Sequence, residues 1–192
     1  VHSGTKYLCG HNDVVAGFVI AAKGSEREAD RSAIDLIYKS EGASLGPFDS
    51  WLMLRSLKTL GLRVERQAAS ALKIAQWLKT QPFATDIYYA GLPEHPAYAL
   101  SKKQAAGFGA MISFKVTSAA LAQKCLGRLK LICFAESLGG VESLLTYPIA
   151  QTHQATPPAL LARVGLDDRL LRLSVGIEDP DDLIADLAQA LS

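Results

Sequence analysis

The sequence has few cysteines, no excess of charge of either sign and no long apolar run. Its three cysteines, Cys9, Cys125 and Cys133, have no close paired spacing, which argues against a disulfide framework or a zinc site. Lysine and arginine total 20 against 19 for aspartate and glutamate, so a net charge of +1 provides no field for nucleic acid or an anionic membrane. No apolar stretch approaches the roughly 20 residues that cross a bilayer. These absences favour small-molecule or protein partners and a reducing, cytoplasmic compartment.

The N-terminus also lacks an initiator methionine and a basic and apolar leader. Such a start predicts a piece of a longer protein or one half of a nicked chain. The hydrophobic content of 49% is nevertheless enough for a sizeable buried core in 192 residues.

The first third of the sequence predicts a strand followed by two helical segments. VVAGFVIAA (14–22) reads as a buried strand, and Ser25 with Glu28 fits a capping box at the start of a helix. Glycines and a proline then break the chain before residues 48–80, whose apolar spacing predicts one long helix. Strand followed by helix is typical of α/β proteins.

Strands and helices alternate through the rest of the chain. Strands are expected at 85–92, 108–116, 129–137 and 170–177, and helices at 118–129, 157–165 and 179–191. The pattern predicts an α/β end-piece of one domain, residues 1–47, and a compact α+β domain over 48–192 that starts with a long linking helix.

Lys6 lies in the polar opening stretch HSGTK, between hydroxyl side chains. In a tight turn that contains glycine, Ser3 and Thr5 can contact a phosphate, and the lysine beside them is a counter-charge or a Schiff-base nucleophile. A P-loop is excluded because GxxxxGK[ST] is absent. Two interpretations stay open: an exposed lysine in a polar loop, or a lysine that carries pyridoxal phosphate with the hydroxyls on its phosphate.

Three other polar features allow both a functional and a structural interpretation. His11 and Asp13 are too few for a metal site and are more typical of a turn held by side-chain hydrogen bonds. Glu136 and Glu142 flank a Gly-Gly turn and suit paired acid/base chemistry or the capping of a following helix. Arg172, inside the apolar LLRLSVG, suits a bidentate contact with a substrate carboxylate, or a solvent-facing place on an edge strand.

Seven stretches together resemble one enzyme family. They are HSGTKYLCGHNDVVAG, LGPFDSWLMLRSLKTLGLRVE, YYAGLPEHPAY, GFGAMISF, AESLGGVESL, the TH of YPIAQTH, and LLRLSVGIEDPDDLIADLAQAL. They resemble, in order, the Cys/Met-metabolism family of pyridoxal phosphate enzymes, which includes cystathionine β-lyase, γ-synthase and γ-lyase. The resemblance implies the α/β, fold-type I, aspartate-aminotransferase-like fold, with residues 1–47 ending the large PLP domain and 48–192 forming the C-terminal domain.

The resemblance assigns three residues to the cofactor. Lys6 matches the lysine that binds pyridoxal 5'-phosphate as a Schiff base and then moves protons between substrate carbons. Ser3 and Thr5 match residues near the cofactor, with a contact to its phosphate implied. No metal is implied.

Four further positions match residues that bind the substrate. Arg172 matches the arginine that grips the α-carboxylate, and Ser137 and Thr152 match residues that place that carboxylate and the arginine. Glu136 matches a family position whose side chain contacts the distal amino group of a substrate such as cystathionine. The residue type at this position does not distinguish β- from γ-elimination.

The similarity of KSEGASLGPFDSWL and ESLGGVESLLTYPIAQTH to bacterial and plant-type β-lyases favours cystathionine β-lyase, which forms homocysteine, pyruvate and ammonia. A γ-synthase or γ-lyase is the alternative, and a catalytically silent assembly module is the non-enzymatic one. The family's aspartate for the pyridine nitrogen, its ring-stacking tyrosine and its phosphate loop would precede residue 1. The chain is therefore expected to be inactive alone and to work with its N-terminal half in a homo-oligomer, a tetramer of dimeric units.

Overall fold

The computed structural model describes residues 1–21, 28–151 and 153–192. The chain forms two compact units, Val1–Leu60 and Gly61–Ser192, and each is described by itself. The domain boundary predicted before residue 48 stays a prediction.

The first unit is built from a short β-ribbon and two helices. β1 (His2–Ser3) pairs antiparallel with β2 (Gly17–Phe18), and a kinked turn, η1 (Gly4–Leu8), follows β1. The helices are α1 (Glu28–Glu41) and α2 (Pro47–Leu57). Cys9, Val14 and Met53 form a small buried core, so the segment after η1 packs against α2.

The apolar run 14–22 is not the buried strand that its composition predicts. In its described part, residues 14–21, only Gly17–Phe18 is strand, and Val15 and Ile20 are 85% and 69% exposed. The ladder stops after two residues because β1, its partner, is itself two residues long. Ala22, like Ser25 of the predicted capping box, lies outside the described residues.

Residues 48–80 form two helices in place of the single one that is predicted. α2 ends at Leu57, and α3 (Leu60–Leu78) begins after a break. At the break the backbone N–H and the hydroxyl of Thr59 both donate to the carbonyl of Ser56, each at 3.2 Å. This local bonding replaces the α-helical ladder, which explains why the helix ends here.

The second unit contains a five-stranded mixed sheet with the strand order β3-β4-β7-β6-β5. The strands are β3 (Ala84–Tyr88), β4 (Met111–Val116), β7 (Leu170–Ser174), β6 (Leu144–Thr146) and β5 (Cys133–Phe134). Neighbours are antiparallel except for the parallel pair β5 and β6. The sequence predicts all of these strands but β6. Because β7 is the central strand, the edge-strand interpretation of Arg172 is wrong.

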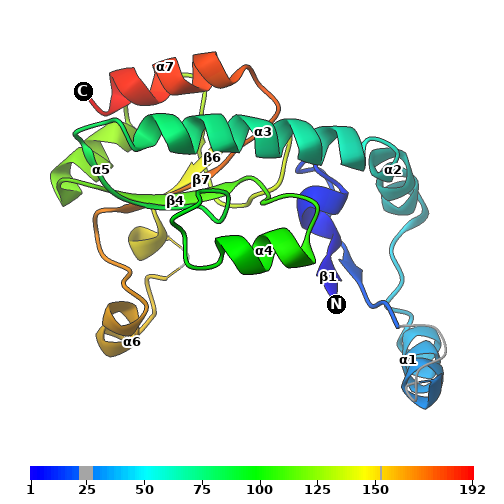
Figure 1. The fold of residues 1–192 in the computed structure, drawn as a ribbon. Helices are drawn as coiled ribbons and strands as arrows, with labels where there is room; N and C mark the ends of the chain where they lie inside the picture. The colour runs from blue at the N-terminus through cyan, green and yellow to red at the C-terminus, as the bar shows by residue number, and fades with distance from the viewer. Residues whose placement is uncertain (22–27, 152) are drawn as a thin grey trace. The chain divides into compact units, whose positions relative to one another are not determined.

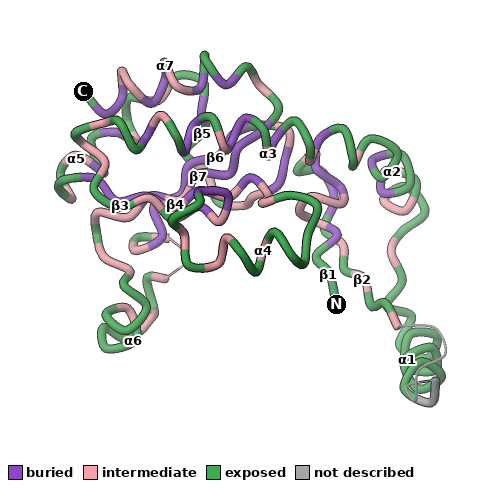
Figure 2. The backbone as a smooth tube through the Cα atoms, in the orientation of Figure 1, coloured by how far each residue is buried: buried purple, intermediate pink, exposed green. Residues whose placement is uncertain are grey.

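Helices cover one face of this sheet. Figure 1 shows α3, α5 (Ala119–Leu126) and α7 (Pro180–Ala190) on the same side of it. Alternate residues of β4 and β7 form the core, and Ile112, Phe114, Leu171 and Leu173 are fully buried (Figure 2). Strand side chains alternate between faces, so Arg172 projects from the opposite face.

Two helices of the second unit begin at side-chain caps. The Ser118 side chain accepts the N–H of Leu121 before α5, and the Asp179 side chain accepts the N–H of Asp181 before α7. α6 (Pro158–Arg163) starts at a proline, and η2 (Pro148–Ala150) is a 3-10 turn. α4 (Tyr98–Gln104) is a helix that the sequence analysis does not predict. No helix in the described ranges is both long and apolar enough to cross a bilayer.

One carboxylate ties α7 to the turn before β5. Asp186 is 6% exposed and accepts the backbone N–H groups of Lys130, Leu131 and Ile132 at 2.8 to 2.9 Å. Burial alone would raise the pKa of Asp186, but these N–H donors stabilise the anion and lower its pKa below the ordinary value. Removing the charge of Asp186 therefore weakens the packing of α7.

Candidate functional site

The turn at the start of the chain gathers the three residues predicted around a cofactor. Ser3 ends β1, and Thr5 and Lys6 lie in η1. The N–H of Gly10 donates to the carbonyl of Lys6 at 2.7 Å, and the backbone of Lys6 is not helical, with φ −90° and ψ −126°. The backbone of the half-buried Lys6 is therefore fixed by the turn that follows it.

The two hydroxyls beside Lys6 differ in their bonding. The hydroxyl of Thr5 accepts the N–H of Ala16 at 2.9 Å and donates to the carbonyl of Ala16 at 3.3 Å, so it holds the β-ribbon. A phosphate contact from Thr5 requires this single donor to turn away from Ala16. Ser3 is exposed, and its hydroxyl has no hydrogen-bond partner in the part of the chain described. Ser3 is thus the hydroxyl with a donor available to an anion.

His11 and Asp13 hold a turn, as the structural interpretation of the sequence has it. Nδ1 of His11 lies 2.8 Å from the carbonyl of Cys9, and Sγ of Cys9 donates to the Asp13 carboxylate at 3.0 Å. Burial, and then the hydrogen bond to Asp13, raise the pKa of the Cys9 thiol. Within the described ranges, no group of three or more His, Cys, Asp or Glu side chains is arranged to hold a metal ion.

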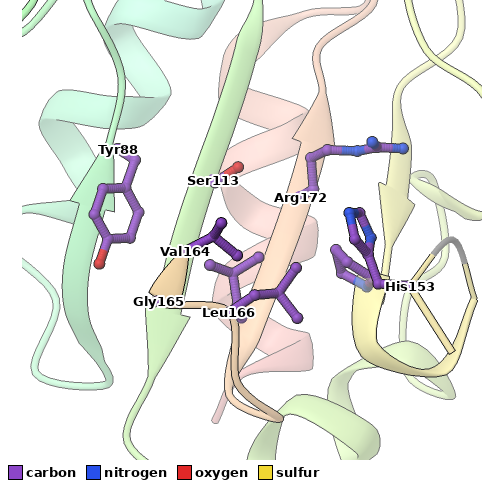
Figure 3. Close-up of a pocket in the computed structure, with 9 residues that line it drawn as sticks. Tyr88, Ser113, His153, Val164, Gly165, Leu166 and Arg172 are labelled. Atoms are coloured by element: carbon purple, nitrogen blue, oxygen red, sulfur yellow. The ribbon is translucent and has the colours of Figure 1, made fainter. Parts of the chain in front are cut away.

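Arg172 lies at the centre of the sheet face that is opposite the helices. It pairs with Ser113 of β4 on one side and with Thr146 of β6 on the other. The side chain reaches from β7 toward β6, where Nη2 makes a long hydrogen bond of 3.4 Å to the hydroxyl of Thr146 (Figure 3). Nε is buried and has no partner among the residues described. A buried guanidinium N–H without an acceptor fits a carboxylate ligand.

A pocket of about 330 Å³ adjoins Arg172 on this face. Its walls come from β3, β4, β7 and the connections around α6, as Figure 3 shows. The lining residues are Tyr88, Ser113, Pro148, His153, Val164, Gly165, Leu166, Leu170 and Arg172. The walls are thus largely apolar, with few polar groups beside the guanidinium, which is the usual composition of a small-molecule site.

The remaining predicted substrate residues lie in or beyond the loop between β5 and β6. Glu136 and Glu142 are exposed, and strand β6 follows them, so the helix-capping interpretation is wrong. Ser137 has φ +102°, a conformation that non-glycine residues rarely adopt. Thr152 lies outside the described residues.

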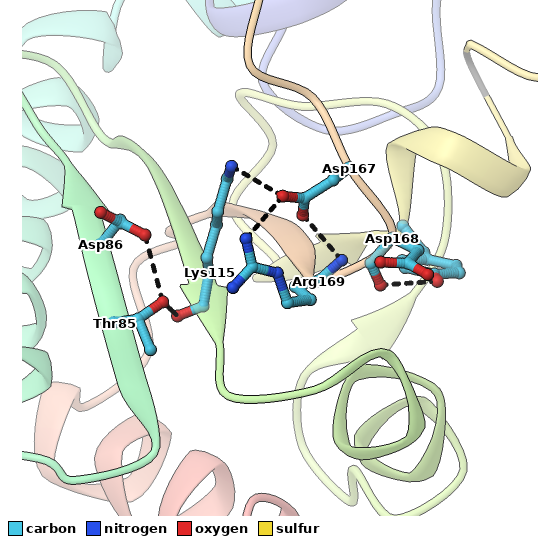
Figure 4. Close-up of polar contacts among 7 residues, drawn as sticks. Thr85, Asp86, Lys115, Asp167, Asp168 and Arg169 are labelled. Atoms are coloured by element: carbon cyan, nitrogen blue, oxygen red, sulfur yellow. Dashed lines mark hydrogen bonds and ion pairs between the residues drawn. The ribbon is translucent and has the colours of Figure 1, made fainter. Parts of the chain in front are cut away.

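An ion cluster holds the connection that forms one wall of the pocket. The Asp167 carboxylate accepts from Lys115 Nζ at 2.9 Å and from Arg169 Nη2 at 2.8 Å (Figure 4). Partial burial would raise the pKa of Asp167, but the hydrogen bonds from Arg169 and Lys115 outweigh it and lower the pKa to about 2. Asp167 therefore anchors the segment before β7 to β4.

Sequence reasoning missed several polar residues of this face. Thr146 lies on the unpredicted strand β6, and Ser113 and Tyr88 are brought to the pocket by the register of β3 and β4. The alternation of polar and apolar residues in MISFKV marks Ser113 as lying on the polar face, but only strand pairing places it beside Arg172.

Comparison with known proteins identifies the family. The model of the Cys/Met metabolism PLP-dependent enzyme family matches residues 1–192. The chain belongs to this family. The predicted family and the fold-type I, mixed α/β architecture implied by the resemblance are both confirmed.

The relatives of the chain carry out different reactions. The chain is 47% identical over 191 residues to "Cystathionine gamma-lyase" of Bacillus subtilis strain 168 and 46% identical to "Cystathionine beta-lyase" of Lactococcus lactis subsp. cremoris strain MG1363. A crystal structure of cystathionine gamma synthase from Xanthomonas oryzae pv. oryzae in complex with cystathionine has a TM-score of 0.92 and 39% identity, and covers 99% of this chain and 48% of that one. Each of the two alignments with these curated relatives covers 100% of this chain and 49% of the relative. The chain thus spans about half the length of these relatives.

Membership of the family implies pyridoxal 5'-phosphate as the cofactor. The residues of the opening turn fit this cofactor. The amine of Lys6 can form a Schiff base with an aldehyde, and three residues before it the hydroxyl of Ser3 has a donor available to a phosphate. Lys6 and Ser3 lie in the first unit, and Arg172 and Ser137 lie in the second. The residues predicted to bind the cofactor and those predicted to bind the substrate carboxylate therefore belong to different units of the chain.

Proposed function

We propose that this chain is part of a pyridoxal phosphate-dependent carbon–sulfur lyase, with cystathionine β-lyase as the favoured activity. Cystathionine and water would give homocysteine, pyruvate and ammonia. The observation that carries the proposal is the buried Nε of Arg172, which lies at the centre of the sheet face and has no partner among the described residues, and which suits an amino-acid carboxylate. Family membership adds the cofactor that makes elimination at an amino acid possible.

Lys6 is the residue that we assign to proton transfer. When bound, pyridoxal phosphate supplies an electron sink for the bonds at the substrate Cα. The amine of Lys6 takes the proton from Cα and returns a proton later, which requires it to lie within hydrogen-bond reach of that carbon. Ser3 donates its hydroxyl to the cofactor phosphate, and Thr5 supports the same turn through Ala16 or joins the phosphate contact.

The substrate is bound by residues of the second unit. Arg172 holds the α-carboxylate by two parallel N–H bonds, one of them from Nε. Ser137 and Thr152 place the carboxylate and the arginine, and Glu136, being exposed, meets the distal ammonium of cystathionine. The N-terminal half of the enzyme supplies the rest of the site, so the chain alone would turn over no substrate.

Modification of Lys6 tests the cofactor assignment. Borohydride reduction of the enzyme assembled with its N-terminal half, followed by peptide mass spectrometry, is expected to find phosphopyridoxyl on Lys6. Lys58→Ala, which changes an exposed lysine of the same unit, should leave the adduct unchanged. An assembled enzyme without any adduct on Lys6 would instead favour a catalytically silent assembly module.

The identity of the keto acid tests the favoured reaction. Pyruvate from cystathionine supports the β-lyase, whereas 2-oxobutyrate would replace it with a γ-lyase. The γ-lyase and γ-synthase are kept as the second candidates because a relative named as a γ-lyase is 47% identical, one named as a β-lyase is 46% identical, and a γ-synthase structure is 39% identical. Arg172→Ala should raise KM steeply while the cofactor absorbance band is retained.

We also propose that the enzyme is a cytoplasmic homo-oligomer, a tetramer of dimeric units. All three cysteines are free thiols, which is usual in a reducing compartment. Light scattering of the assembled enzyme measures the oligomeric state, and a monomer would rule the tetramer out.

A further inference from the structure

The segment that carries Glu136 and Ser137 is fixed at both of its ends by hydroxyl groups of the sheet. The hydroxyl of Thr146 donates to the carbonyl of Ala135 at 3.2 Å. The hydroxyl of Ser174 accepts the N–H of Gly139 at 2.8 Å. The two predicted substrate residues therefore lie between two anchored backbone groups.

The two hydroxyls lie on the same sheet face as Arg172. Thr146 is the direct cross-strand partner of Arg172, and Ser174 follows it by two residues on β7. Thr146 and Ser174 are each 1% exposed, so water does not compete for their hydrogen bonds. Thr146 also accepts the long hydrogen bond from Arg172 Nη2. One side chain thus contacts both the guanidinium and the loop.

The backbone between the anchors has a conformation that needs outside support. Ser137 and Gly139 have φ values of +102° and +78°, and only the glycine adopts such an angle without strain. Gln67 of α3 adds a third tie, because its Nε2 donates to the carbonyl of Gly140 at 2.7 Å. Without these ties, Ser137 would relax toward an ordinary backbone angle and its position relative to the guanidinium would change.

We propose that Thr146 and Ser174 are positioning residues that set Ser137 and Glu136 relative to Arg172 for binding of the amino-acid substrate. This inference rests on the proposed function, because it takes Arg172 as the carboxylate ligand. Recognition of a planar carboxylate tolerates little displacement of its donors, so a small shift of the loop weakens binding without removing any contact residue.

The test removes each hydroxyl alone in the enzyme assembled with its N-terminal half and loaded with cofactor. Thr146→Val and Ser174→Ala are each expected to raise KM for cystathionine about tenfold, the effect of one buried hydrogen bond, with kcat changed less than about threefold. Thr146→Ser keeps the hydroxyl and should restore KM. Ser70→Ala is the matched control, since Ser70 is a buried serine of α3 whose hydroxyl has no partner in the described residues, and its KM should equal that of the wild type.

A second measurement is independent of turnover. Hydrogen exchange of the peptide that covers residues 135–140 should be about tenfold faster in Thr146→Val and Ser174→Ala, and unchanged in Ser70→Ala. Unchanged exchange in both hydroxyl variants would overturn the anchoring, and faster exchange with unchanged KM would overturn the positioning role alone. A wild-type enzyme that turns over no sulfur amino acid would overturn the proposed function and the positioning role with it.

Discussion

The ion cluster around Asp167 allows a quantitative prediction about stability and pH. A pKa lowered from the ordinary 3.8 to about 2 corresponds to roughly 2.5 kcal/mol of preference for the charged form in the fold. The Asp167 side chain is 35% exposed, so screening by water reduces this to about 1 kcal/mol. This figure already includes the contact with Lys115, whose side chain is 10% exposed. Asp167→Asn should therefore lower the free energy of unfolding by about 1 kcal/mol at pH 7.

The pH dependence of this difference has a defined sign. Because the pKa of Asp167 is lower in the folded state, its stabilisation is fully present above the unfolded pKa near 4 and is lost as the pH falls through about 2. The gap in urea midpoint between the wild type and Asp167→Asn should be constant from pH 7 to 5 and shrink between pH 4 and 2. Taking the difference between the two proteins cancels the titration of the other carboxylates.

An exposed ion pair provides the matched control for Asp167. Asp181 bonds Lys73 at 2.7 Å, but these side chains are 72% and 49% exposed, so Asp181→Asn should cost no more than about 0.5 kcal/mol. The electrostatic account of the cluster would be refuted if Asp167→Asn and Asp181→Asn lost equal free energy of unfolding. It would also be refuted if the difference in urea midpoint between the wild type and Asp167→Asn stayed constant down to pH 2.

Three further predictions concern other buried groups. Asp186→Asn should destabilise the chain by about 2 kcal/mol in urea unfolding, because an amide oxygen is a poorer acceptor for three backbone N–H groups, whereas Asp182→Asn on the exposed side of α7 should be neutral. Gly176→Ala should lower the free energy of unfolding by about 3 kcal/mol or more, since its Cβ would overlap the carbonyl of Val141. Gly61 has open space around it, so Gly61→Ala should leave thermal stability unchanged or raise it. A thiol reagent should label Cys133 quickly and Cys125 only after unfolding, because burial, and then the charge of Asp186, raise the pKa of Cys125 to about 12; rapid native labelling in Cys133→Ser would contradict this.

The fold was predictable where apolar alternation was strong. The strands at β4 and β7 follow directly from MISFKV and LLRLS, whose alternate residues enter the core. β6 was missed because all three of its residues are buried, on both faces, so that no alternation marks it. The break between α2 and α3 depends on the hydrogen bonds of Thr59, which a helical pattern of apolar residues does not encode.

The candidate site was predictable only in part, for a similar reason. The residues around Lys6 did not by themselves choose between a polar turn and a cofactor lysine, and the resemblance to the family made the assignment. Arg172 stood out as a charge within an apolar strand. The hydroxyls of Thr146 and Ser174 become meaningful only through strand register and through their bonds to Ala135 and Gly139, which are tertiary information.

The place of β7 in the sheet has a consequence for how the protein is made. β7 is the last strand along the chain, yet it lies between β4 and β6. During synthesis, both of those strands leave the ribosome before the strand that joins them, and each exposes an open hydrogen-bonding edge until β7 follows. The arginine-bearing strand is thus also the closing piece of the sheet. Slow elongation just before β7 would lengthen the time in which the open edges of β4 and β6 can pair with another strand.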